Sequence, residues 1–196
     1  MARVLIMHGW TNRRQENTWH RILVSELRHQ GHQVLYPQFP NTDNPSLDDW
    51  QELLLAELAL LEEAGPGETV VIGHSLGCVN FIHAAVDGKI TKQIDRLLFI
   101  APADPKLLGE IAGLKVALHK SETRKALEGA VKSLTIVGSD ADPWIPDGVQ
   151  ETFGVPLGVE AIVIEGAQHF RGDEGWGRWQ GILDWVNDPS ADITVR

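Results

Sequence analysis

The residues with the clearest chemical potential stand in the segment GHSLG (residues 73–77), which has the pattern G-x-S-x-G around Ser75. A β-branched run precedes the segment and a stretch with helical spacing follows it, so Ser75 is predicted at a sharp strand-to-helix turn. Glycine on both sides of the serine would remove the collisions that such a strained turn imposes. The first N–H groups of the helix would face an oxyanion formed there. Ser75 is therefore the candidate nucleophile; the alternative is a tight turn with a helix-capping serine.

A serine hydroxyl attacks only when a base takes its proton and a third group orients that base. Of the eight histidines, His169 lies just after the last apolar run and before the last helical segment, so it can face the same sheet edge as Ser75. His74 is expected to point to the other side of the turn, and His8 to shape the loop after the first strand. The other five fall on helices or helix exits with no matching partner: His20, His29, His32, His83 and His119.

The acid that would orient His169 has three candidates. Asp142 precedes a proline in the turn DPWIP (residues 142–146), which constrains the backbone and can aim a carboxylate at the histidine loop. Asp140 is the alternative that could accept local N–H bonds, and Asp104 has the ready explanation of a helix N-cap. The favoured set is Ser75, Asp142 and His169, and the chain order Ser, Asp, His is that of α/β-hydrolases.

This set would perform acyl transfer to water through an acyl-enzyme. A tetrahedral oxyanion needs two donors, and we expect the backbone N–H of Leu76 and that of Trp10, with Gly9 as the alternative to Trp10. Trp10 and Trp144 are expected to line the substrate pocket, while most other tryptophans fit core packing. Two other functions stay open: a non-catalytic interaction protein, and an acyltransferase or C–C hydrolase that uses the same residues.

Six short apolar runs alternate with helical stretches, which predicts a mostly parallel sheet covered by helices on both faces. The predicted strands lie at 3–8, 33–37, 69–74, 94–102, 133–139 and 159–166, and the clearest helical stretches at 18–31, 46–67, 76–88 and 174–188. Residues 1–188 are expected to form one domain, followed by a loose tail at 189–196. The segment 103–132 does not follow this alternation of strands and helices. It is interpreted as a solvated helix, with a short flap over the cleft as the alternative.

Composition narrows the function classes. The net charge of −10 argues against nucleic-acid binding, and no apolar stretch approaches the roughly 20 residues of a membrane span, so neither nucleic acid nor membrane is expected as a partner. One cysteine, Cys78, favours a reducing cytoplasm. No metal-ligand motif or dinucleotide fingerprint occurs, so no metal or cofactor is expected. A small-molecule acyl substrate is the predicted partner; protein partners and oligomeric state stay open.

Four motifs together resemble the retinoblastoma-binding-protein-9-like serine hydrolase family: HGW (8–10), GHSLGC (73–78), DPWIP (142–146) and GAQH (166–169). The resemblance covers nearly the whole chain in order and approximate spacing. It implies a compact α/β-hydrolase fold with strand order 2-1-3-4-5-6 and no large cap domain. It also implies the same triad, Ser75, Asp142 and His169. With that order, the first and third strands are neighbours, and the cleft lies at a topological switch point.

Overall fold

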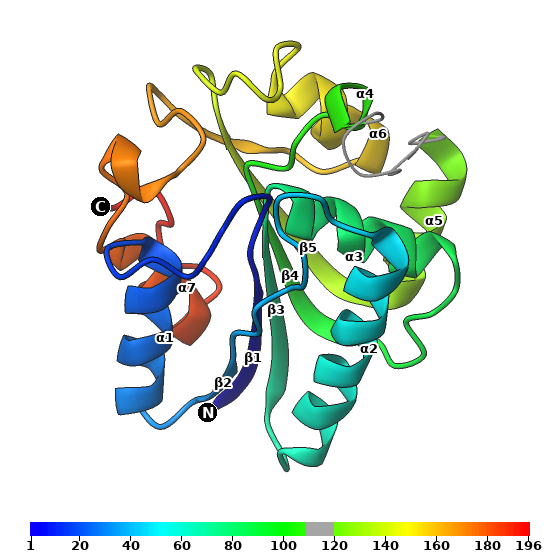
Figure 1. Cartoon of the computed structure of the whole chain (residues 1–196), viewed down its shortest axis with the longest axis vertical. Coiled ribbons are helices and arrows are strands. Elements are labelled where there is room, and N and C mark those ends of the chain that lie inside the picture. The colour runs from blue at the N-terminus through cyan, green and yellow to red at the C-terminus, as the bar shows by residue number, and fades with distance from the viewer. Residues whose placement is uncertain (109–119) are drawn as a thin grey trace.

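The computed structural model describes residues 1–108 and 120–196 of the chain. Its centre is a six-stranded sheet with the order β2-β1-β3-β4-β5-β6, in which every neighbouring pair is parallel (Figure 1). The strands are β1 (Ala2–Met7), β2 (Gln33–Leu35), β3 (Glu68–His74), β4 (Ile94–Ile100), β5 (Val131–Ser139) and β6 (Ile162–Ile164). The predicted fold class and strand order are thereby confirmed.

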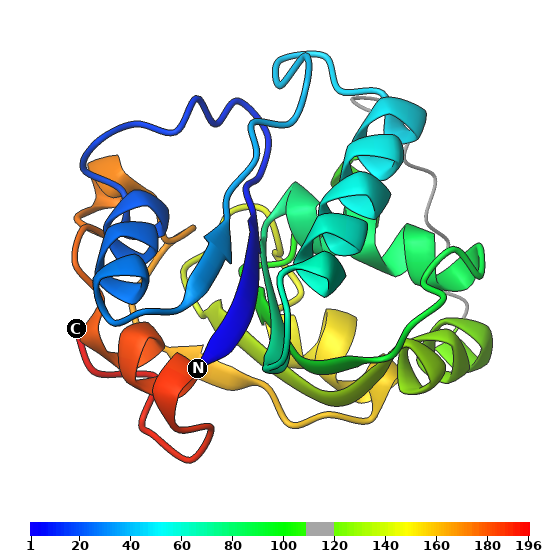
Figure 2. The ribbon, with the colours of Figure 1, turned by 90° about the horizontal axis from the view of Figure 1, so that it is seen from below.

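Helices cover both faces of this sheet, as Figures 1 and 2 show. One face carries α1 (Trp19–His29) and α7 (Gln180–Asn187). The other carries α2 (Leu47–Glu63), α3 (Leu76–Val86) and α5 (Lys120–Ala130). Two short helices, α4 (Pro105–Leu108) and α6 (Val155–Leu157), stand in the connections before and after α5 and β5.

The strands alternate their side chains between two hydrophobic cores. In β1, Val4 and Ile6 pack under α1 and α7, whereas Leu5 and Met7 pack under α2 and α3. Because both faces are covered, apolar residues are required at successive positions, which explains the continuous apolar runs. The same chain geometry sends the loops after β1, β3, β5 and β6 to one edge of the sheet, since carboxyl ends of parallel strands coincide.

Several elements differ in extent from the sequence prediction. The edge strands β2 and β6 have three residues each, and α7 begins at Gln180 rather than near 174, because residues 172–174 form a separate 3-10 turn that ends in the left-handed Gly175. Residues 189–196, for which the sequence predicts a loose tail, lie against α7: Ile193 is buried and its carbonyl accepts a hydrogen bond of 2.7 Å from Trp179 Nε1.

The segment 103–132 contains α4, the whole of α5 and the first two residues of β5. The alternative of a flap over the cleft depends on residues 109–119, which lie outside the described residues. Within the ranges 1–108 and 120–196, none of the helices combines the length and apolarity of a membrane span.

Candidate functional site

The turn that carries Ser75 joins β3 to α3 with strained backbone angles. Ser75 has φ 53° and ψ −119°, a region that L residues rarely occupy and that is held here by the surrounding fold. We call residues 73–77 the nucleophile turn. A Cβ on Gly77 would lie 2.8 Å from the Met7 carbonyl oxygen, and one on Gly73 would lie 3.1 Å from the Cys78 nitrogen. The flanking glycines therefore allow the close backbone approach that the sequence pattern indicated.

A chain of hydrogen bonds links the three predicted residues. His169 Nε2 lies 2.8 Å from Ser75 Oγ, and His169 Nδ1 lies 2.9 and 2.8 Å from the two carboxylate oxygens of Asp142. All three side chains are buried. Because the carboxylate only accepts, Nδ1 must carry the proton, which leaves Nε2 bare to accept the Ser75 hydroxyl proton. The arrangement can therefore activate a serine as a nucleophile.

The loop that carries His169 is itself strained and is tied down by side chains from three other segments. Its residues Gln168 and Phe170 have φ values of 54° and 57°. The indole N–H groups of Trp19 and Trp176 donate to the backbone carbonyls of Phe170 and Ala167, at 3.0 and 2.8 Å. The Glu174 carboxylate accepts from the His169 and Arg171 backbone N–H groups at 3.0 and 2.9 Å. These bonds compensate the strain and hold His169 in place.

The other two carboxylate candidates have local roles. Asp140 Oδ1 accepts the Gly166 backbone N–H at 2.7 Å and ties the loop after β5 to that after β6. Asp104 Oδ1 accepts the Lys106 N–H at 2.8 Å, as an N-cap of α4 would. Of the three, only Asp142 lies within hydrogen-bond distance of His169.

The predicted oxyanion donors flank the nucleophile from two segments. Leu76 is the first residue of α3, so its N–H has no intrahelical acceptor. Trp10 lies in the loop after β1, and its backbone N–H has no acceptor within the described part of the chain. Its indole packs edge-on against Trp144 at 5.9 Å between ring centroids, and both tryptophans line the cavity that contains Ser75. Phe39 and Phe170 are buried in the two cores, and Phe170 also borders the cavity.

Gly9 allows the loop after β1 to approach Ser75 closely. A Cβ at this position would lie 2.7 Å from Ser75 Cβ and 3.2 Å from Ser75 Oγ. Gly9→Ala is therefore expected to displace the serine and to lower kcat by about 100-fold. Kinetics with an ester substrate would measure this. Gly129→Ala, in α5 with open space around the added Cβ, is the matched control and should leave kcat unchanged. Equal kcat for Gly9→Ala and wild type would contradict the close approach.

Three other histidines lie buried beside the site. His74 Nε2 donates to the His169 carbonyl at 2.9 Å and so supports the loop that carries His169, and its ring lines the cavity over Ser75, although the sequence predicted that it would point to the other side of the turn. His8 Nε2 accepts the Phe39 backbone N–H at 2.9 Å and shapes the loop after β2. Burial lowers the pKa of His8 to about 4 and that of His74 to about 3, and lowers the pKa of His20 well below its usual value. All three are therefore neutral at pH 7.

These shifts predict a stability that declines in mild acid. Between the folded pKa values and about 6.5, the unfolded chain binds protons that the folded protein excludes, so the free energy of unfolding rises with pH. The contribution of these neutral histidines to the free energy of unfolding is fully present above pH 6.5. Below pH 6.5 the free energy of unfolding decreases by about 1.4 kcal/mol per pH unit for each histidine, or about 4 kcal/mol per pH unit for all three. Denaturant unfolding at pH 7, 6 and 5 would measure the slope.

The matched variant for this prediction is His74→Gln, whose amide can still donate to the His169 carbonyl. It should reduce the slope by about a third, the share of one histidine in three. His29→Gln, at an exposed position on α1, should leave the slope unchanged. A free energy of unfolding that stays constant from pH 6.5 to 5 would contradict the prediction.

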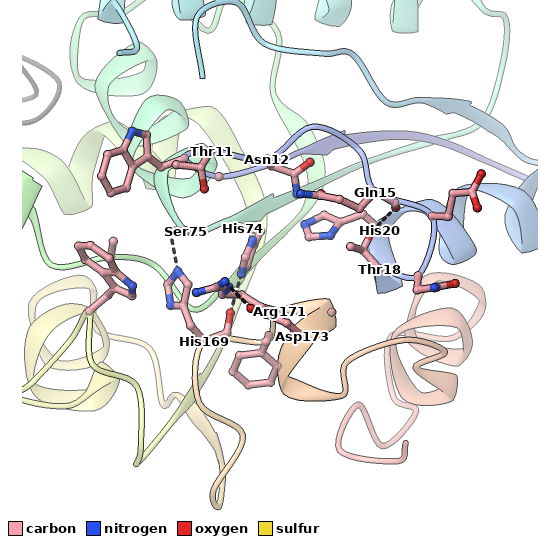
Figure 3. Close-up of a pocket in the computed structure, with 18 of the residues that line it drawn as sticks. Thr11, Asn12, Gln15, Thr18, His20, His74, Ser75, His169, Arg171 and Asp173 are labelled. Atoms are coloured by element: carbon pink, nitrogen blue, oxygen red, sulfur yellow. Dashed lines mark hydrogen bonds and ion pairs between the residues drawn. The ribbon is translucent and has the colours of Figure 1, made fainter. Parts of the chain in front are cut away.

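A cavity of about 580 Å³ opens over Ser75 and His169. Besides Trp10 and Trp144, it is lined by residues that the sequence did not single out (Figure 3): Asn12, Gln15, Thr18, His20, Arg171 and Asp173. Most of them are ordinary polar loop residues, and His20 was interpreted as a helix histidine without a partner. Only the fold brings the start of α1 beside the loop after β6, so no local signal could have identified them.

Neither a metal centre nor a second nucleophile is built into the described region. Within residues 1–108 and 120–196, no group of three or more His, Cys, Asp or Glu is placed to hold a metal ion. Cys78 lies fully buried on α3 beneath the nucleophile turn, with its Sγ 3.6 Å from the Ile100 carbonyl oxygen, and burial raises the pKa of its thiol. Its protonated, enclosed state suits packing rather than attack.

Comparison with known proteins identifies the family of the chain. A family model described as serine hydrolase matches residues 4–188. YdeN of Bacillus subtilis (strain 168), described as a hydrolase, is 23% identical over 173 residues, which are 88% of each chain. Its crystal structure superposes with a TM-score of 0.73 at 20% identity, covering 94% of this chain and 96% of that one.

Two further structures share the fold. A YdeN-like hydrolase from Pectobacterium atrosepticum has a TM-score of 0.69 at 18% identity and covers 100% of this chain and 93% of its own. A structure from a study of the metagenome-derived lipolytic enzymes LipS and LipT has a TM-score of 0.67 at 18% identity and covers 94% and 91%.

Proposed function

Because the chain belongs to the serine hydrolase family, we propose that it hydrolyses a carboxylic ester, thioester or activated amide through an acyl-enzyme on Ser75. The observation that carries this proposal is the continuous hydrogen-bond chain from Ser75 Oγ through His169 to Asp142. A binding-only protein would not require a strained serine, a base in the correct tautomer and a buried acid in one line.

The proposed reaction begins when Ser75 Oγ attacks the substrate carbonyl while its proton passes to His169 Nε2. The Asp142 carboxylate stabilises the imidazolium that forms. The carbonyl oxygen becomes an oxyanion, for which the N–H groups of Leu76 and Trp10 are the donors. His169 then returns the proton to the leaving alcohol, thiol or amine, and the C–O, C–S or C–N bond breaks. Water, deprotonated by His169, then attacks the acyl-enzyme; the bond between Ser75 Oγ and the acyl carbon breaks, His169 returns the proton to Oγ, and the carboxylic acid leaves.

The size and lining of the cleft support a small or medium acyl substrate. About 580 Å³ lies within the range of small-molecule sites. The edge-on pair Trp10–Trp144 offers apolar surface beside the reacting atoms. A structure of similar fold is described as lipolytic, which favours esters over amides as the first substrates to test. Within the serine hydrolases, the motifs HGW and DPWIP favour a place near the retinoblastoma-binding-protein-9-like members.

The test is intact mass after brief exposure to a fluorophosphonate probe, followed by a panel of esters of increasing acyl length. We expect one adduct on wild type, none on Ser75→Ala, and turnover of at least one ester. Labelling without turnover of any ester or thioester would favour an acyltransferase or C–C hydrolase on the same residues. Absence of labelling in folded protein at several pH values would overturn the proposal and favour the interaction protein.

A further inference from the structure

The cavity over Ser75 has two walls of different chemistry. One, the tryptophan wall, consists of Trp10, Trp144, Ala103 and Leu108. The other, which we call the polar wall, consists of Asn12, Gln15, Thr18 and His20, with Arg171 and Asp173 at its rim. Figure 3 shows Asn12, Gln15, Thr18 and His20 grouped on one side of the Ser75–His169 pair. A substrate that fills the cavity must therefore satisfy hydrogen-bonding groups on one side.

His20 is the unusual member of the polar wall. It is 2% exposed, and neither of its ring nitrogens has a hydrogen-bond partner among the described residues. The ring is held by aromatic neighbours: it stacks on Trp19 at 3.6 Å between centroids and lies 4.9 Å from His74. A phenylalanine would make the same contacts without unpaired polar atoms, and buried polar atoms are normally paired. Packing therefore does not account for a histidine here.

A third unpaired nitrogen lies beside these two. His74 Nε2 donates to the His169 carbonyl, so its Nδ1 is a bare acceptor, and this atom too is buried without a partner in the described residues. His20 and His74 therefore place three buried ring nitrogens, without a partner among the described residues, close to Ser75. A polar group of a ligand would satisfy them.

The charge at this wall selects an uncharged group. Burial lowers the pKa of His20, so its ring is neutral and offers one donor and one acceptor. Arg171 pairs with Asp173 at 2.5 Å, and Glu16 pairs with Arg21 at 3.9 Å, so the charges at the rim are balanced. His20 is itself among the residues that line the cavity, so a group bound there meets its ring.

We infer that His20 determines specificity, and that the polar wall binds a hydroxyl or similar uncharged donor–acceptor group of the substrate. The substrate class is then hydroxylated esters rather than simple alkyl esters. This inference rests on the proposed function of Ser75. It assigns the tryptophan wall to the apolar part of the same molecule.

The test compares kcat/KM within two pairs of esters. Propyl and 2,3-dihydroxypropyl butanoate differ in the alcohol part, and methyl butanoate and methyl 3-hydroxybutanoate differ in the acyl part. In wild type, the hydroxylated member of one pair should be preferred by about tenfold or more. His20→Phe should bring that ratio close to one, and His20→Gln should retain part of it. The pair that responds identifies the part of the substrate that meets the polar wall.

The control is His83→Phe, the same substitution at a histidine on α3 that also has an unpaired nitrogen but does not line the cavity. It should leave the ratio unchanged. Melting temperatures identify unfolded variants, and His20→Leu replaces His20→Phe if the latter does not fold. The inference would be overturned if wild type preferred the hydroxylated ester in neither of the two pairs. It would also be overturned if the preference survived both His20→Phe and His20→Leu.

A second readout separates this inference from the proposed function. Protection of wild type against fluorophosphonate labelling by 1-O-butylglycerol, compared with butyl propyl ether, requires no ester turnover. Stronger protection by the diol, lost in His20→Phe, supports the polar wall even if every ester in the panel is inert. Equal protection by both compounds counts against it.

Discussion

Ser75→Ala is expected to lower kcat/KM for a hydrolysed ester by on the order of 10⁶-fold, because it removes the hydroxyl on which the acyl-enzyme is proposed to form. The remaining rate would come from substrate binding and the oxyanion donors alone. Steady-state kinetics with the best ester of the panel, at enzyme concentrations high enough to detect the residual rate, would measure the loss.

The fold should survive this substitution. Alanine keeps a Cβ at the φ of 53°, so the strain of the nucleophile turn persists and the melting temperature should remain close to that of wild type. Ser133→Ala, at an exposed position on β5, serves as the control with full activity. Activity within tenfold of wild type in folded Ser75→Ala would show that a different group attacks the substrate.

Asp142→Asn is expected to lower kcat by on the order of 10⁴-fold while the protein remains folded. The carboxylate accepts from His169 Nδ1 with both oxygens and from the Trp144 backbone N–H at 2.9 Å. An amide can turn its NH₂ toward the histidine and so favour the tautomer that carries its proton on Nε2. That tautomer cannot accept the proton of Ser75.

The informative comparison is Asp140→Asn, two residues earlier in the same loop. Asp140 Oδ1 accepts the Gly166 N–H, and an asparagine oxygen can do the same, so kcat should fall less than tenfold. Kinetics of both variants with one ester would decide which carboxylate orients the base. A larger loss in Asp140→Asn than in Asp142→Asn would reverse the assignment.

The sequence predicted those features that depend on local pattern. Continuous apolar runs indicated buried parallel strands, and glycines around Ser75 indicated the strained turn. The strand order came from the family resemblance rather than from the pattern. The choice of Asp142 over Asp140 and Asp104 rested on turn chemistry, and the distances to His169 agree with it.

The features that the sequence did not predict are those made by distant segments. The polar wall combines the start of α1 with the loop after β6, roughly 150 residues later, as the bond of Trp19 to Phe170 spans 151 positions. His20 has no local signature because, apart from its neighbour Trp19, its aromatic contacts come from distant segments: Tyr36 follows β2 and His74 ends β3. The late start of α7 follows from the 3-10 turn at residues 172–174. The side chain of Glu174 in this turn accepts the backbone N–H of His169 and so supports the loop that carries this histidine.

Cys78 lies enclosed beneath the nucleophile turn, so the rate of its chemical modification reports how often this part of the protein opens. It is the only thiol in the chain and is fully buried, so a reagent cannot reach it while the turn is closed. Its modification by a thiol reagent therefore proceeds through openings of β3 and α3. At saturating reagent, the rate of modification equals the rate of opening, which connects a single chemical label to the lifetime of the strained conformation at Ser75.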